Sequence, residues 1–150
     1  MKVPIAKDFP DHHDAELVLK LYELRRESVM RESRKFMLND WWPKGYEDLA
    51  AIAKFDHPDN AKLRQVTGYW ELAYGLAKHG IVQPEYLADS MGGEGFFLLA
   101  RVHPFLERFR TEAPNPRFLR NTEWIATNTE IGKALFAAIL ARTQQMIAAR

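Results

Sequence analysis

Residues 60–80 read NAKLRQVTGYWELAYGLAKHG, and their apolar residues recur at intervals of three and four. One column of this stretch contains Leu63, Val66, Trp70, Ala73 and Ala77. This spacing predicts an α-helix with one core-facing stripe that includes Trp70. The stretch closes on a lysine, a histidine and a glycine, which suits the cationic last turn and the left-handed terminus of a helix.

Proline, glycine and capping residues divide the rest of the chain into further helical segments. We predict a long helix from an N-cap at Asp11 to about residue 39, with Glu27 and Arg31 as an i,i+4 ion pair. The other predicted segments are a short helix around residues 49–53, a helix at 84–91 starting with Pro84, one at 94–111 kinked at Pro104, one capped by Asn115 before Pro116, and a C-terminal helix behind a capping box at Thr127–Glu130.

No run of alternating apolar and polar residues indicates a strand. The fold class expected is therefore all-α, an irregular helical bundle of about six to seven helices without a sheet. We expect a single domain over residues 1–150, with residues 1–10 as an extended N-terminal arm. In the long first helix, Tyr22, Val29 and Phe36 form the expected core column, with Met30 and Met37 beside it.

Composition excludes several functional classes. The 150 residues include no cysteine, so disulfides, thiolate nucleophiles and cysteine metal sites are ruled out. A net charge of +1 gives the whole chain no long-range attraction to nucleic acid or to anionic lipid. The longest apolar runs are far shorter than a membrane span, and no targeting segment is recognisable. We therefore expect a cytoplasmic protein without a membrane partner.

A set of short motifs resembles a known family. The aromatic pair in residues 69–73 precedes Lys78-His79-Gly80-Ile81-Val82. The pattern continues with a short acidic segment at 85–87 and with Arg108, and it ends with Phe118 and Glu123. Over residues 60–125 this pattern is similar to a domain-of-unknown-function family of short all-helical bacterial proteins. The resemblance implies a helical fold, and it assigns no activity and no functional residue.

The densest group of potential metal ligands lies at residues 11–16. His12, His13 and Glu16 belong to it, and His12 and Glu16 are one helical turn apart. A metal-dependent enzyme using these three residues is one alternative. The favoured interpretation is an exposed helix start whose acidic residues complement the helix dipole. Because the Glu-x-x-His motif of di-iron bundles is also absent, we expect neither a metal nor another cofactor.

The most basic stretch, residues 101–120, supports a second alternative. Arg101, Arg108 and Arg117 are interleaved with phenylalanines, a pattern typical of single-strand binders. Glu107 and Glu112 dilute the charge, however, and the phenylalanines have core spacing. A solvated face is therefore favoured over a nucleic-acid or anion site, and nucleic acid is an unlikely partner.

The leading hypothesis is a non-catalytic protein-binding or assembly module. Trp41 and Trp42 form either an exposed partner anchor or a lid over the end of the bundle. The C-terminal helix has apolar residues on two faces, including Phe136 and Leu140. One face would pack on the core. The other would contact either the long first helix or the same helix of a second subunit, and we favour the homodimer.

Overall fold

The computed structural model describes residues 7–150, and every regular element in that range is helical. In chain order these are α1 (His12–Leu24), α2 (Ser28–Lys35), the π-helix η1 (Phe36–Asp40), α3 (Tyr46–Ile52), α4 (Asn60–Lys78), α5 (Pro84–Val102), the 3-10 helix η2 (His103–Phe105), α6 (Leu106–Glu112), α7 (Arg120–Asn128) and α8 (Glu130–Ala148). The all-α prediction is confirmed. Most of the predicted N-terminal arm, residues 1–6, lies outside the described residues.

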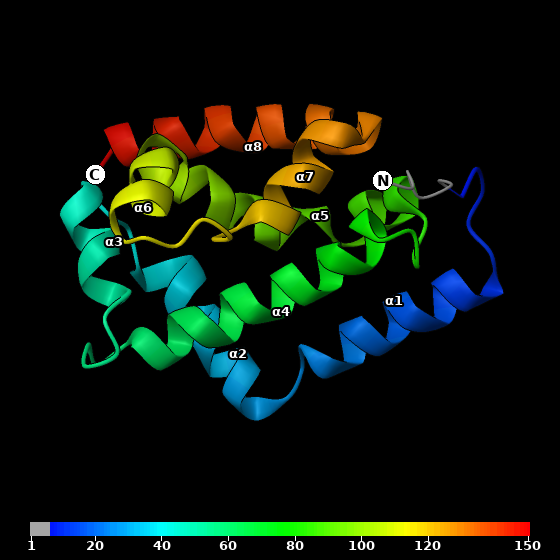
Figure 1. Ribbon diagram of the computed structural model, residues 1–150, viewed down its shortest axis with the longest axis horizontal. Helices are drawn as coiled ribbons and strands as arrows, with labels where there is room; N and C mark the ends of the chain where they lie inside the picture. Colours follow the sequence, from blue (N-terminus) through cyan, green and yellow to red (C-terminus); the bar gives the residue numbers. More distant parts are fainter. Residues whose placement is uncertain (1–6) are drawn as a thin grey trace.

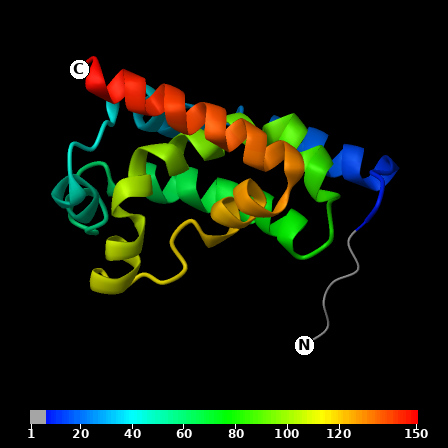
Figure 2. The same ribbon diagram turned by 90° about the horizontal axis from the view of Figure 1, so that it is seen from above.

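Helix α5 runs through the middle of the bundle and packs against α4, α7 and α8. In Figure 1, α8 lies along one side of the molecule and α1 along the opposite side, with α4 and α5 between them. Seen from above, α8 is nearest the viewer and crosses in front of the other helices (Figure 2). In the described part of the chain, no helix is long and apolar enough to cross a membrane.

The core forms around the column that residues 60–80 predict. All five members of that column are at most 4% exposed. Trp70 stacks on Tyr74 with a centroid separation of 5.3 Å, and Tyr74 in turn contacts Phe96 of α5. Gly80 ends the helix with a φ of 75°, a conformation that costs glycine little. The predicted helix, its buried face and its terminus are therefore confirmed.

The continuous helix predicted from Asp11 to residue 39 is wrong, although its start is correct. Asp11 accepts a hydrogen bond from the N–H of Asp14, and the Asp14 carboxylate accepts one from the N–H of Asp11. The helix ends at Leu24, and a new helix starts after Glu27, whose carboxylate accepts the N–H of Val29 and Met30 at 3.1 and 3.0 Å. Glu27 therefore caps a helix instead of pairing with Arg31.

The break changes which residues face the core. Met30 and Met37 are buried, whereas Val29 is 55% exposed and Tyr22 is also exposed. Because the chain turns at residues 25–27, the three-four spacing counted through that point does not describe one helical face. Of the predicted core column, Tyr22 and Val29 are therefore wrong, Phe36 is half-buried against the core, and the two methionines beside the column are buried.

The predicted junction between the helices at 84–91 and 94–111 is a kink inside α5, where the backbone at Met91 is non-helical. Two other boundaries differ from the sequence predictions. Helix α7 starts behind Leu119, which has a φ of 55°, and not behind Asn115. Thr129, not Thr127, caps α8 by accepting the N–H of Gly132 at 2.9 Å. The predicted break at Pro104 is confirmed as η2.

Carboxylates from neighbouring helices hold two helix starts in place. Glu71 of α4 accepts the N–H of Thr122 at 2.8 Å and its hydroxyl at 2.7 Å. Glu85 of α5 accepts the N–H of Ile131 at 2.9 Å. Each carboxylate satisfies free N–H groups at the positive end of the helix dipole. These contacts fix α7 against α4 and α8 against α5.

Candidate functional site

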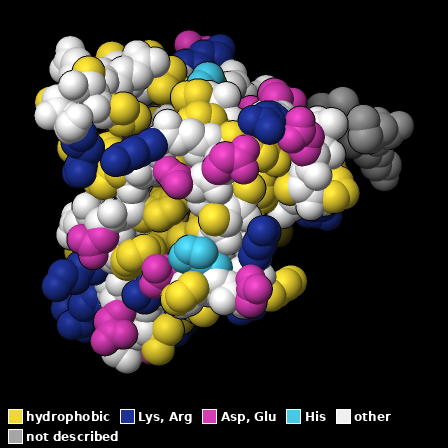
Figure 3. Space-filling view, turned by 90° about the vertical axis from the view of Figure 1, so that its left-hand side faces the viewer, with side chains coloured by type: hydrophobic (Ala, Val, Ile, Leu, Met, Phe, Trp, Pro, Cys, Tyr) yellow, Lys and Arg dark blue, Asp and Glu magenta, His cyan; other side chains and the backbone are white. Residues whose placement is uncertain are grey.

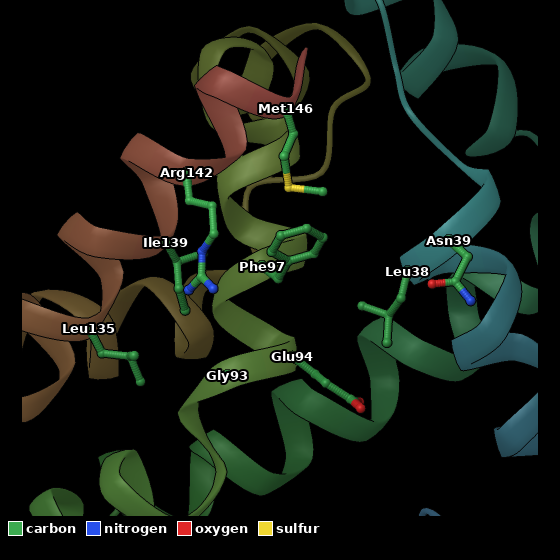
Figure 4. A pocket seen from close by; sticks show the side chains of 9 residues that line it. All are labelled: Leu38, Asn39, Gly93, Glu94, Phe97, Leu135, Ile139, Arg142 and Met146. Carbon is green, nitrogen blue, oxygen red and sulfur yellow. The ribbon is translucent and has the colours of Figure 1, made fainter. Parts of the chain in front are cut away.

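An open pocket with a volume of about 560 Å³ lies between η1, α5 and α8. Figure 4 shows the side chains that line it: Leu38, Asn39, Gly93, Glu94, Phe97, Leu135, Ile139, Arg142 and Met146. Five of these side chains are large and apolar, and two carry a formal charge. This size and composition are typical of small-molecule sites.

Helix α8 supplies one wall of the pocket. Leu135, Ile139, Arg142 and Met146 follow one another at intervals of four, three and four residues, so they share one face of the helix. Three of the four are apolar, and the fourth, Arg142, extends from α8 on the wall of the pocket across from Phe97 (Figure 4). The wall is thus apolar with a single cation.

Helix α5 forms the floor of the pocket, and Gly93 keeps that floor open. A Cβ atom built on Gly93 would meet no other atom within 4 Å, so the space beside it is free. One turn further along, the Phe97 ring lies against Trp42, with 5.9 Å between the ring centroids. The absence of a side chain at residue 93 therefore contributes directly to the pocket volume.

The third wall is the π-helix η1, and Arg101 of α5 holds it in place. The Arg101 guanidinium donates hydrogen bonds to the carbonyls of Met37, Leu38 and Trp41, the last at 2.6 Å. These carbonyls belong to the end of a helix, where intrahelical donors are lacking. Burial lowers the pKa of Arg101 to about 10, so the side chain stays charged at neutral pH. Arg101 therefore acts as a C-terminal cap for η1.

The two charged residues that line the pocket differ in whether they are paired with an opposite charge. Glu94 accepts a hydrogen bond from Nε of Arg34 at 2.8 Å and lies 3.9 Å from a guanidinium nitrogen of Arg25. Both oxygens of this carboxylate are bonded to Arg34. Arg142, by contrast, makes no ion pair with any of residues 7–150. The pocket thus contains a neutralised acid and a cation that is free to bind a ligand.

Trp41 and Trp42 lie beside this pocket. Trp41 is 9% exposed and belongs to the core. Trp42 is half-buried, its Nε1 donates to the carbonyl of Asn39 at 3.0 Å, and its ring lies between the guanidinium groups of Arg101 and Arg150. Both indoles therefore support the wall formed by η1, and neither stands out as a free anchor.

Phe136 and Leu140 are half-buried and pack against the core. The Phe136 ring lies 6.1 Å from Phe96 and 5.8 Å from His103. Helix α8 packs mainly on α5 and α7, so α1 is not its second partner. The outer face of α8 stays exposed over four alanines, Ala134, Ala137, Ala138 and Ala141.

The three candidate anion-binding arginines do not share a surface. Arg101 is 1% exposed and bound to carbonyls. Arg108 is exposed, pairs with Glu112 at 3.0 Å and lies over the Tyr46 ring, and Arg117 is exposed in the loop before α7. Figure 3 shows basic and acidic side chains interspersed over the end of the molecule that bears α3 and α6. This face therefore lacks a continuous basic patch.

His12, His13 and Glu16 are all exposed on α1. Within residues 7–150, no three histidine, cysteine, aspartate or glutamate side chains gather as they would around a metal ion. Asp14, in contrast, is fully buried and accepts the N–H of Gln83 at 3.2 Å. Its carboxylate links the start of α1 to the start of α5, so it has a structural role.

The sequence analysis did not identify Leu38, Gly93, Phe97 and Arg142 as site residues. One signal was present: an arginine interrupts an apolar stripe of α8 at position 142. Its meaning depends on which segment faces that stripe, and η1 is about one hundred residues away in the chain. The sequence could therefore indicate an unusual position but not a pocket.

Comparison with known families gives one match. A family model described as "Domain of unknown function (DUF4760)" matches residues 10–129. This range contains the parts of the pocket on η1 and α5, whereas the four residues on α8 lie beyond it. No curated protein and no solved structure matches the chain.

Proposed function

The chain belongs to the DUF4760 family, and we propose that it is a non-catalytic helical binding module whose site is the pocket between η1, α5 and α8. The observation that carries this proposal is the pocket itself. It has a volume of about 560 Å³, its lining is mostly apolar, and one arginine there has no ion-pair partner among residues 7–150. Sites with these properties bind small apolar molecules with a few polar groups.

The rigidity of the walls supports a binding role. Arg101 ties η1 to α5, and Glu85 ties the start of α8 to α5. A pocket whose walls are already ordered loses little conformational entropy when a ligand enters, so more of the contact energy appears as affinity.

The proposal is tested by titration with the neutral fluorescent probe N-phenylnaphthylamine. We expect saturable binding of about one probe per chain. Gly93→Phe should abolish it, because the new ring fills space that is open beside Gly93. Gly68→Phe is the matched control, since Gly68 is also an exposed helical glycine with free space around it and lies outside the pocket. Equal binding by both variants would contradict the proposed site.

We further propose that the chain forms a homodimer through α8. Its support is the exposed outer face of that helix, which includes Ile131 and four alanines and which α1 does not cover. Small residues allow two helices to approach closely, and a two-fold axis would bring the same face of α8 from both subunits together. Sedimentation at micromolar concentration should give a dimer that Ala138→Glu dissociates and Ala51→Glu, on exposed α3 surface, does not. A monomeric wild type would exclude this interface.

A further inference from the structure

We propose that the ligand of this pocket is a medium-chain monocarboxylate, with its carboxylate on Arg142 and its alkyl chain on the apolar wall. This inference rests on the proposed binding function, and it adds the chemical class of the ligand.

Arg142 is the group that selects a carboxylate. Its side chain is exposed to solvent and extends from α8 beside Ile139, on the wall of the pocket across from Phe97 (Figure 4). Among residues 7–150 it has neither an ion pair nor a side-chain hydrogen bond, so the donors of its guanidinium are available. A planar guanidinium matches the two oxygens of a carboxylate and binds them with two parallel hydrogen bonds.

The surrounding charges favour an anion with one charge. Arg25, Arg34 and Arg142 give three positive charges and Glu94 gives one negative charge, so the net charge of the four groups is 3 − 1 = +2. This balance disfavours a cationic ligand. Arg34 neutralises Glu94, so Arg142 is the one charged group of the lining that has no counter-charge among residues 7–150. One unpaired guanidinium is matched by one carboxylate, which suits a monoanion.

The lining favours an alkyl body. Leu38, Leu135, Ile139 and Met146 present flexible aliphatic and thioether side chains, and Phe97 forms the floor. Asn39 is the one uncharged polar side chain in the lining, so a polar body such as a sugar would lose its hydrogen bonds on entering. Each methylene that enters should raise the affinity roughly fourfold, as the burial of apolar surface predicts.

The test uses three probes with the same ten-carbon chain: decanoate, decanol and decyltrimethylammonium, each below its micellar concentration. Calorimetric titration should show decanoate as the tightest of the three. Arg142→Gln should weaken the binding of decanoate by about 10- to 100-fold, because a charge-assisted hydrogen bond is lost, and it should leave the binding of decanol unchanged. Arg117→Gln, an exposed arginine outside the pocket, should change neither. Hexanoate and octanoate should bind progressively more weakly than decanoate.

Three results would overturn the ligand class while leaving the pocket itself supported. The first is unchanged decanoate binding by Arg142→Gln. The second is binding of decanol or decyltrimethylammonium that is at least as tight as that of decanoate. The third is wild type that binds the naphthylamine but none of the decyl probes. The proposed function would fail in a different way, because the neutral naphthylamine probe would then bind Gly93→Phe as well as the wild type.

Discussion

The guanidinium of Arg101 lies 3.7 Å from the centre of the Trp42 ring and 4.5 Å from that of Phe97. Through its hydrogen bonds to carbonyls of η1, the same guanidinium connects that π-helix to the last turn of α5. One buried cation therefore satisfies a helix terminus and also fixes the distance between two walls of the pocket.

Replacing Arg101 should damage both stability and binding. Arg101→Met leaves the carbonyls of Met37, Leu38 and Trp41 without this donor, so we expect a loss of about 2–4 kcal/mol in the free energy of unfolding. Naphthylamine binding should weaken because η1 is no longer fixed. Arg108→Gln, which alters an exposed arginine seven residues away, should cost less than about 0.5 kcal/mol. Urea denaturation measures the free energy of unfolding of both variants. Equal losses for Arg101→Met and Arg108→Gln would contradict the capping role of Arg101.

We expect Trp70 to stabilise the fold and not to take part in ligand binding. Its ring is fully buried between Tyr69 and Tyr74, so Trp70→Ala should cost about 3–5 kcal/mol. Leu72→Ala, at a position on the same helix that is 65% exposed, should cost less than about 0.5 kcal/mol. A loss of under about 1 kcal/mol for Trp70→Ala in a denaturant melt would show that the column is not the core.

The core around Trp70 could be predicted from sequence because one helix contains the whole signal. The positions of Leu63, Val66 and Trp70 relative to one another follow from helix geometry alone. The break after Leu24 could not be predicted in this way. Glu27 suits an i,i+4 ion pair with Arg31, and glutamate is not among the residues that favour an N-cap, so the sequence does not indicate a helix start there. In the structure Glu27 caps α2, which packs against α4.

The pocket depends still more on tertiary structure. Leu38, Phe97 and Arg142 come from three distant segments, and no local pattern specifies that they meet. The apolar stripe of α8 can be predicted from the sequence, but the stripe does not indicate which segment Arg142 faces. The left-handed backbone at Leu119 was also unexpected, since residues other than glycine rarely adopt it.

Replacing two glycines of α5 by alanine should change the stability of the protein in opposite directions. Gly93→Ala places a methyl group in free space and improves helix propensity, so we expect a gain of about 0.5–1 kcal/mol. At Gly95 the same methyl group would collide with the Tyr74 ring, and Gly95→Ala should lose about 1–3 kcal/mol. Thermal unfolding measures both changes. A destabilised Gly93→Ala would contradict the open floor of the pocket.

The cap of α2 should depend on pH. Hydrogen bonds from the N–H groups of Val29 and Met30 lower the pKa of Glu27 below its ordinary value. A depressed pKa in the folded state means that the carboxylate stabilises the fold above its ordinary pKa, and that this stabilisation is lost as the pH falls through the folded-state pKa. Wild type should therefore be more stable than Glu27→Ala at neutral pH, and the two should converge in acid.

Unfolding temperatures of the two proteins, measured from neutral to acid pH, test this directly. Glu32→Ala supplies a control on the same helix, because the Glu32 side chain caps no backbone N–H in residues 7–150. A constant difference between wild type and Glu27→Ala at every pH would mean that the ionised carboxylate is not the cap.

The claim that the pocket between η1, α5 and α8 is the binding site is tested most directly by methyl NMR spectra recorded during a titration with N-phenylnaphthylamine. An aromatic ligand shifts the signals of the methyl groups that it touches. We predict that the shifts concentrate on the pocket methyls of Leu38, Leu135, Ile139 and Met146. Shifts confined to distant methyls such as those of Leu49 and Leu63, or a spectrum that does not change, would contradict the claim.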